Sequence, residues 1–555
     1  MQMDALKQRL CLPDEEVDED ISVTLSSLIT SAVHDDPPRC TLREISQATE
    51  QTGAASALEP LSVLPMLIPC SDEYAQSLLQ VIGEHASAKE TVMALQEIVE
   101  TLGRSLQSID DEEERPEDKT LSPAVQLARV MRLYAASIPR LPKRKRLPHE
   151  VIQPLFSELN SVISLSIRDV EPRGSRLLLA STSDLVRKLA SWTHSDGTNT
   201  VETLSKTSGV LYDILSKVVE AYSARVHSTL AQEAFNEQFS RLVIPSDVQA
   251  STSGSPDDPW NDVWDAMRSL GITVQICESR PSLGSLILLA HSKSYTMSTS
   301  VLVKFTPIIV SSIQSNTALD ETLFVLLRSI APLRTQISAP ELPPDVLIPL
   351  AHVLPPLASV HPDPATRHQT FRLLSLVLRF SPSYLRLNIL HSLLTDPDSA
   401  AQMRVAAVGL VKEAALEAVA TVPGTTGSSE NVFASPIFLR TLGSVLFRSD
   451  PPDLLDGSEL SLDEFLESPE PLRLVEVLGL FYLLLKRDTN NRTGIRDSAT
   501  SVQSNLLDPI RRHIERWHTS SGEDNDEDEH PEMQLGILQM WVERTSEAID
   551  DLHKR

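Results

Sequence analysis

Apolar residues recur at three- and four-residue spacing along most of this chain, and hardly any stretch alternates as a strand does. The predicted helical stretch 200–240 carries one apolar stripe, formed by Leu211, Ile214, Val218 and Tyr222. The same spacing predicts helices over residues 88–106, 148–169, 173–193, 293–313, 318–336 and 470–488. Only the segment GITVQIC at 271–277 indicates an extended conformation. The pattern therefore predicts an all-α protein.

Several helix starts are marked by a capping side chain followed at once by proline. Serine or aspartate accepts hydrogen bonds from the free N–H groups of the first turn, and proline lacks the N–H that would stay unpaired there. Starts near 363, 381 and 399 are about 18 residues apart, so two helices make a unit of about 36 residues. This length predicts an irregular HEAT- or armadillo-like helical-repeat solenoid. The marked starts are Ser122-Pro123, Asp363-Pro364, Ser381-Pro382, Ser435-Pro436 and Ser468-Pro469.

The length of 555 residues exceeds what one ordinary hydrophobic core accommodates. The segment PSDVQASTSGSPDDP at 245–259 is the best candidate for a boundary, since it is rich in proline, serine and aspartate. We expect an N-terminal helical-repeat half at 1–245, a linker or long loop at 246–259, and a C-terminal half at 260–555. A continuous solenoid that carries a long loop there is the alternative. Further loops are predicted at 110–118, 423–430 and 523–529.

Charge and cysteine usage narrow the possible partners. The chain has 76 Asp and Glu against 49 Lys and Arg, a net charge of −27, so it should repel nucleic acid and anionic lipid. The four cysteines lie far apart without CxxC spacing, which fits a reducing compartment and argues against a zinc site or disulfides. The sequence contains neither a signal-peptide pattern nor about 18 consecutive apolar residues. We expect a cytoplasmic monomer that binds proteins.

Catalytic motifs are absent from the sequence, which has no P-loop, GxGxxG, GxSxG, HExxH or kinase HRD pattern. His513 and His518 are five residues apart and so lie on different faces of a helix, where they cannot easily share a metal. We therefore expect no enzyme activity, cofactor or metal. The cluster RLPKRKR at 140–146 indicates either a nuclear import signal or docking patch, or a basic loop that offsets the nearby acidic run. Its densest part consists of Lys143, Arg144, Lys145 and Arg146.

Residues 361–420 predict three successive helices joined by tight turns. One face of the second helix is lined by Leu387, Leu390 and Leu394. The small side chains of the third helix should allow a neighbouring helix to approach closely. They form the stripe Ala407, Val411, Ala414 and Ala418.

The segments RHQTFRLLSLVLRFSPSYLRLNILHSLL, MRVAAVGLVKEAALEA and ASPIFLRTLGSVLF, within 361–447, resemble the glomulin family. This family includes fungal Yap-binding proteins and a plant lateral-root protein. The resemblance implies a HEAT-like adaptor without enzymatic activity. Animal glomulin binds the RING-box subunit of cullin-RING ubiquitin ligases and masks the surface that receives the ubiquitin-conjugating enzyme. Fungal relatives are linked to a bZIP transcription factor and the oxidative-stress response.

The leading hypothesis is therefore an adaptor that regulates or inhibits cullin-RING ubiquitin ligases through the RING-box subunit. The alternatives are a cofactor of a bZIP stress-response factor and a helical tether in membrane traffic or proteasome assembly. An acidic helical groove would steer a basic partner in the first two cases, toward a RING-box protein or a basic DNA-binding region. A tryptophan among arginines is typical of binding hot spots, although Trp517 could instead pack inside the last repeat. The predicted contact residues are Arg492, Arg511, Arg512, Glu515, Arg516 and Trp517.

Overall fold

The computed structural model describes residues 6, 8–10, 20–107, 120–142, 146–169, 171–195, 200–226, 228–240, 258–292, 295–335, 341–420, 431–455, 460–520 and 529–554. Within these ranges the regular structure is helical. One isolated antiparallel bridge joins Cys70 and Thr120, and no β-strand occurs in the same ranges. The predicted all-α helical-repeat fold is confirmed.

The chain forms two compact units. The first comprises residues 1–296 and 315–325, and the second comprises 297–314 and 326–555. Helix α16 (Leu319–Ile330) therefore supplies residues to both units. The predicted boundary at 246–259 lies outside the described residues except for Asp258 and Pro259, and the helices on either side of it belong to the first unit.

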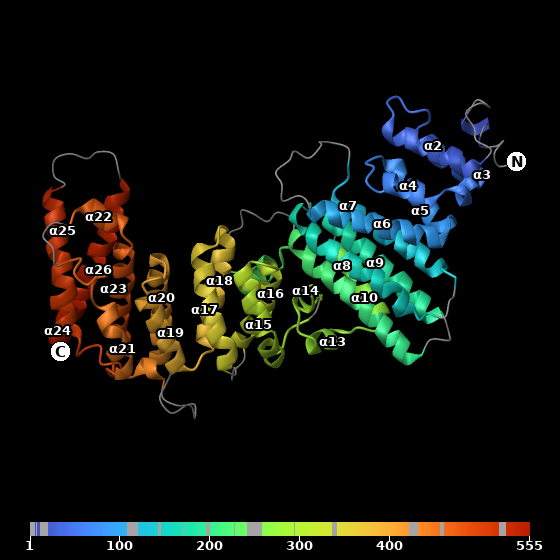
Figure 1. The fold of residues 1–555 in the computed structure, drawn as a ribbon. Coiled ribbons are helices and arrows are strands. Elements are labelled where there is room, and N and C mark those ends of the chain that lie inside the picture. Colours follow the sequence, from blue (N-terminus) through green and yellow to red (C-terminus); the bar gives the residue numbers. More distant parts are fainter. Residues whose placement is uncertain are drawn as a thin grey trace. The chain divides into compact units, whose positions relative to one another are not determined.

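Long helices that lie side by side form the centre of the first unit (Figure 1). Helix α7 packs against α9, α9 against α10, α10 against α8, and α8 against α6. The α-helices of this unit are α2 (Ile21–His34), α3 (Leu42–Thr52), α4 (Pro60–Leu67), α5 (Glu73–His85), α6 (Ala88–Gln107), α7 (Pro123–Ser137), α8 (Pro148–Leu165), α9 (Pro172–Ser195), α10 (Val201–Tyr222), α11 (Leu230–Gln238), α12 (Pro259–Ser269), α13 (Val274–Ser279) and α14 (Leu283–Ala290).

The predicted helix over 200–240 is interrupted. Helix α10 ends at Tyr222, a 3₁₀ turn follows, and α11 begins at Leu230. The carboxylate of Asp320 caps this second start by accepting hydrogen bonds from the backbone N–H groups of Leu230 and Ala231, both at 3.0 Å. Burial raises the pKa of Asp320, although these hydrogen bonds oppose the shift. The cap comes from a residue far along the chain, so local periodicity could not show the break. The stripe predicted within α10 is confirmed, because its four side chains are fully buried.

The prediction of an extended segment at 271–277 is wrong. Residues 274–279 form helix α13, with the N–H groups of Ile276 and Cys277 donating to the carbonyl of Thr273. The side chain of Cys277 is buried, and α13 packs against α14. The β-branched residues favour a strand only weakly, and packing overrides that preference here.

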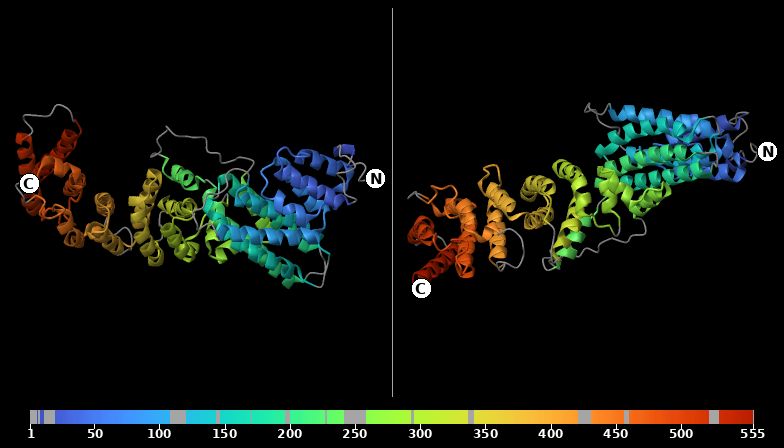
Figure 2. Two further views of the ribbon diagram at one scale, coloured as in Figure 1. Left: turned by 45° about the horizontal axis from the view of Figure 1, so that its top comes forward. Right: turned by 90° about the horizontal axis from the view of Figure 1, so that it is seen from below.

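Helices in the second unit follow one another at nearly regular spacing. Helices α17 to α20 begin at Pro344, Pro364, Ser383 and Ala401, so successive starts are 20, 19 and 18 residues apart. The C-terminal helix, red in Figure 2, lies against α23 among the orange helices. The α-helices of this unit are α15 (Thr299–Ser315), α17 (Pro344–Val360), α18 (Pro364–Arg379), α19 (Ser383–Thr395), α20 (Ala401–Ala420), α21 (Pro436–Leu446), α22 (Leu462–Glu467), α23 (Glu470–Arg487), α24 (Ala499–Val502), α25 (Asp508–Ser520) and α26 (Glu529–His553).

The predicted helix starts agree with the structure to within two residues. Helices α7, α18 and α21 begin at the predicted prolines, whereas α19 and α23 begin just after theirs. Asp363 caps α18 by accepting from the N–H groups of Ala365 at 3.2 Å and Thr366 at 2.9 Å. The predicted stripes of α19 and α20 are confirmed as buried faces.

Candidate partner-binding site

Helix α20 has apolar or small residues on two faces. The predicted stripe with Val411 faces the core, where that side chain is fully buried. On another face Val405, Ala406 and Gly409 are only half-buried. A surface helix in a globular protein normally carries one apolar face and one polar face. The second apolar face of α20 therefore marks a possible contact surface.

This second face forms the floor of a groove of about 800 Å³, here called the α20 groove. Helix α18 lines one part of it, and the end of α22 and the start of α23 line another. The volume falls in the range of binding sites, which is roughly 300–1,000 Å³. The side chains that form the groove include Phe371, Arg372, Val405, Ala406, Gly409, Lys412, Glu413, Leu466, Glu467, Leu472, Glu476 and Gln534.

Charged side chains surround the apolar floor. Lys412 forms an ion pair with Glu476 across α20 and α23, and Glu413 accepts a hydrogen bond from the Ser375 hydroxyl at 3.1 Å. The Glu467 side chain, at the end of α22, is exposed. The buried Nε of Arg372 has no acceptor among the described residues. The groove thus combines an apolar floor with three carboxylates and two cations at its edge.

A buried ion pair fixes the wall beside α23. The Arg473 guanidinium donates two hydrogen bonds to the Glu470 carboxylate, at 2.6 and 2.7 Å, and further hydrogen bonds to the backbone carbonyls of Leu446 and Arg448. The N–H of Asp450 donates to the same carboxylate at 3.2 Å. Because both charged side chains are almost fully buried, this network holds the segment after α21 against the start of α23.

Trp517, a predicted contact residue, is 4% exposed and packs inside the last repeat. Its ring stacks on Phe465 with centroids 4.9 Å apart, and its Nε1 donates to the carbonyl of Leu460 at 3.1 Å. These contacts hold α22 in place, and the next residues, Leu466 and Glu467, line the α20 groove. The structure therefore gives this tryptophan a supporting position behind the groove wall.

Four of the predicted contact residues lie with Trp517 on α25. The side chains of Arg512, Glu515 and Arg516 are exposed, and their spacing places them on one face of the helix. Arg511 is partly buried and donates through Nη2 to the Ser546 hydroxyl at 2.7 Å. The sixth residue, Arg492, lies apart in the loop after α23, where its N–H donates to the Asp488 carboxylate at 2.9 Å. Binding through these residues stays a prediction.

His513 and His518 lie on different faces of α25, as expected. His513 is buried, with Nε2 3.1 Å from the carbonyl of Leu455, and His518 is exposed. In the part of the chain that the structure describes, no three His, Cys, Asp or Glu side chains gather as a metal site would require. Burial raises the pKa of the Cys277 thiol to about 11, so little of the nucleophilic thiolate forms near neutral pH.

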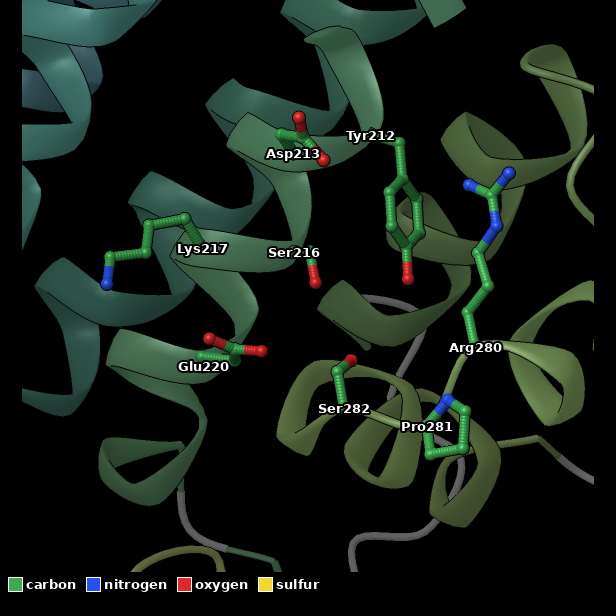
Figure 3. A pocket seen from close by; sticks show the side chains of 8 residues that line it. All are labelled: Tyr212, Asp213, Ser216, Lys217, Glu220, Arg280, Pro281 and Ser282. Atoms are coloured by element: carbon green, nitrogen blue, oxygen red, sulfur yellow. The ribbon is translucent and has the colours of Figure 1, made fainter. Parts of the chain in front are cut away.

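A second cavity, of about 320 Å³, lies in the first unit between α10 and the Arg280–Ser282 segment. Figure 3 shows the side chains of Tyr212, Ser216 and Glu220 on α10 facing that segment. The Glu220 carboxylate accepts from the N–H of Gly284 at 2.9 Å. A Cβ at Gly284 would lie 2.4 Å from the Ser216 hydroxyl oxygen, so any larger residue here would force the Ser216 side chain to move. These polar groups join α10 to α14, and we assign the cavity no ligand.

The α20 groove lies in a part of the chain that matches a known protein family. A family model described as an uncharacterised protein family, YAP/Alf4/glomulin, matches residues 282–541. Residues 282–541 belong to this family. The resemblance seen over 361–447 is thereby confirmed, and family membership indicates a protein-binding adaptor. A search of curated proteins finds no match to the chain.

The match to the YAP/Alf4/glomulin family includes every side chain of the α20 groove and all six predicted contact residues. The cavity beside α10 lies outside it except for Ser282. None of the helices in the described ranges is long and apolar enough to cross a membrane. The sequence alone does not predict the groove, because its walls come from helices far apart in the chain. The apolar character of α20 on two faces was the available signal.

Proposed function

We propose that the chain is a non-enzymatic adaptor that regulates cullin-RING ubiquitin ligases by binding the RING-box subunit. The observation that carries this proposal is the coincidence of the family match with an open groove in the second unit. Burial of the apolar groove floor would supply binding free energy, and the surrounding polar side chains would supply specificity. The adaptor would act in the cytoplasm, and also in the nucleus if the basic cluster at 140–146 is an import signal.

Electrostatics support a basic partner. The net charge of −27 raises the encounter rate with positively charged surfaces and lowers it with acidic ones. Regulation would follow from occlusion, since an adaptor of this size that covers the RING-box subunit would also hinder the ubiquitin-conjugating enzyme. This mechanism needs no catalytic group on the chain.

The test uses the full chain with a purified cullin and RING-box complex. We expect direct binding and slower ubiquitin transfer, with no hydrolysis of any component. Charge reversal at Arg511 and Arg512 should weaken binding more than the same reversal at Lys143 and Arg144. The exposed Arg512 gives the cleaner variant, because Arg511 also bonds to Ser546. A well-folded chain that neither binds the complex nor alters ubiquitin transfer would refute the proposal.

The alternative is a cofactor that binds a bZIP stress-response factor, and the YAP proteins named in the family description favour it. A bZIP basic region is a positively charged helix, which also suits an acidic partner. This alternative predicts direct capture of a bZIP factor and unchanged ubiquitin transfer. The same two assays therefore separate the two functions.

A further inference from the structure

We propose that the α20 groove binds an amphipathic α-helix of the partner, whose apolar face lies on the small and apolar groove floor and whose basic residues face the acidic side chains of α22. This inference deepens the proposed function. It rests on that function in one respect, since the helix that docks in the groove belongs to a protein partner. It names the kind of segment that is recognised and the place where it lies.

One apolar face of α20 is left uncovered. Val405, Ala406 and Gly409 face the groove although they stand in the middle of a 20-residue helix that is well packed on its other side. On the opposite wall the Leu472 side chain is 57% exposed. A groove lined by apolar side chains from two helices is typical of sites that bind an amphipathic helix.

Gly409 stands in the middle of α20, on the groove floor. A glycine inside a helix is destabilising relative to alanine, so its presence there needs a reason. A Cβ at this position would meet no atom within 4 Å, so packing inside the chain does not require the glycine. Together with Ala406 it keeps the groove floor low, which allows the backbone of another helix to approach closely.

The groove floor is long enough for a short helix. Groove-lining residues of α20 run from Ala401 to Glu413. At about 1.5 Å per residue this floor is roughly 18 Å long, which corresponds to three turns of a docked helix. A short amphipathic helix with apolar residues at three- and four-residue spacing fits such a floor.

The α22 side of the groove carries negative charge. The exposed Glu467 of α22 lines the groove, and the exposed Asp463 and Glu464 lie four and three residues before it, on the same side of that helix. None of the described cations forms an ion pair with these three side chains. On the floor, Lys412 is already paired with Glu476. The α22 side of the groove is therefore negative, and lysine or arginine on the flank of the docked helix would complement it.

The experiment measures binding of labelled probe helices to the full chain by fluorescence anisotropy. One probe is a peptide of about 15 residues, long enough for roughly four helical turns. It carries leucine and alanine on one face and lysine along one flank. A second probe has glutamate in place of each lysine. The blocking variant is Gly409→Arg, which fills the floor and adds a positive charge. The matched control is Gly209→Arg on α10, where a Cβ also meets no atom within 4 Å.

We expect the lysine probe to bind the unmodified chain at least about tenfold more tightly than the glutamate probe, a difference of one decade in Kd. Gly409→Arg should remove this binding while the melting temperature stays unchanged or rises, and Gly209→Arg should leave it unchanged. Glu467→Lys should reduce the preference for lysine. Binding of neither probe, or equal binding to the chain with Gly409→Arg, would overturn the proposal.

The outcome is separate from that of the proposed function. If the RING-box complex binds the chain but neither probe does, the groove inference fails and the ligase function stands. If the lysine probe binds in the groove but the RING-box complex does not bind the chain, the ligase function fails and the groove inference stands.

Discussion

Removal of Arg473 tests whether the buried ion pair holds the second unit together. In Arg473→Met the carboxylate of Glu470, 1% exposed, loses two hydrogen bonds and its counter-charge. The carbonyls of Leu446 and Arg448 lose their donor at the same time. The Asp450 N–H remains as a partner for the carboxylate. The variant therefore leaves a buried charge with one remaining hydrogen bond.

The expected loss follows from these contacts. Breaking a buried ion pair from one side costs about 3–5 kcal/mol in the free energy of unfolding, because an uncompensated charge stays behind. The double variant with Glu470→Leu and Arg473→Met removes that charge and should recover part of the loss. It cannot recover all of it, since buried carbonyls left without a donor cost about 1–3 kcal/mol each.

Urea denaturation followed by far-ultraviolet circular dichroism measures these losses. The matched control is Lys206→Met in the exposed pair of Lys206 and Glu202 on α10, where the N–O distance is 2.7 Å and the side chains are 56% and 76% exposed. It should cost far less than Arg473→Met, because water screens an exposed ion pair. A loss in Arg473→Met no larger than in this control, or a double variant no more stable than Arg473→Met, would show that the buried ion pair does not hold the unit together.

Two further substitutions test the helix packing around the groove. Val411→Asp puts a carboxylate on the fully buried face of α20 and should cost several kcal/mol, seen as loss of soluble protein; normal thermal stability would mean that the helix register is wrong. Asp363→Ala removes the cap of α18 and should cost about 0.5–2 kcal/mol near neutral pH. The Thr366 hydroxyl, which donates to Asp363, holds the pKa of this carboxyl below its ordinary value of 3.8. The stability that a lowered pKa adds is present above the unfolded pKa and is lost as pH falls through the folded pKa. The melting-temperature difference from the unmodified chain should therefore shrink below about pH 4 and not above it.

The helical fold could be predicted because its signals are local. A proline after a capping residue marks a helix start without reference to the rest of the chain, and α7, α18 and α21 begin where it predicts. Apolar spacing likewise identifies the buried faces of α19 and α20. The failures depend on tertiary contacts, which local patterns do not show. The break before α11 depends on Asp320, and α13 is helical because it packs against α14.

The candidate site could not be predicted for a related reason. Apolar spacing tells which residues of a helix avoid water, but it does not tell how many neighbouring helices cover them. Val405 and Ala406 alternate around α20 with the buried Ala407 and Val411, so the sequence shows one apolar helix and no boundary between its faces. The distinction arises when α22 and α23 take positions beside the helix and leave part of it open. Trp517 shows the same limit. The arginines around it in the sequence suggest a partner contact, whereas its stacking on Phe465 makes it a support for the α22 wall of the α20 groove.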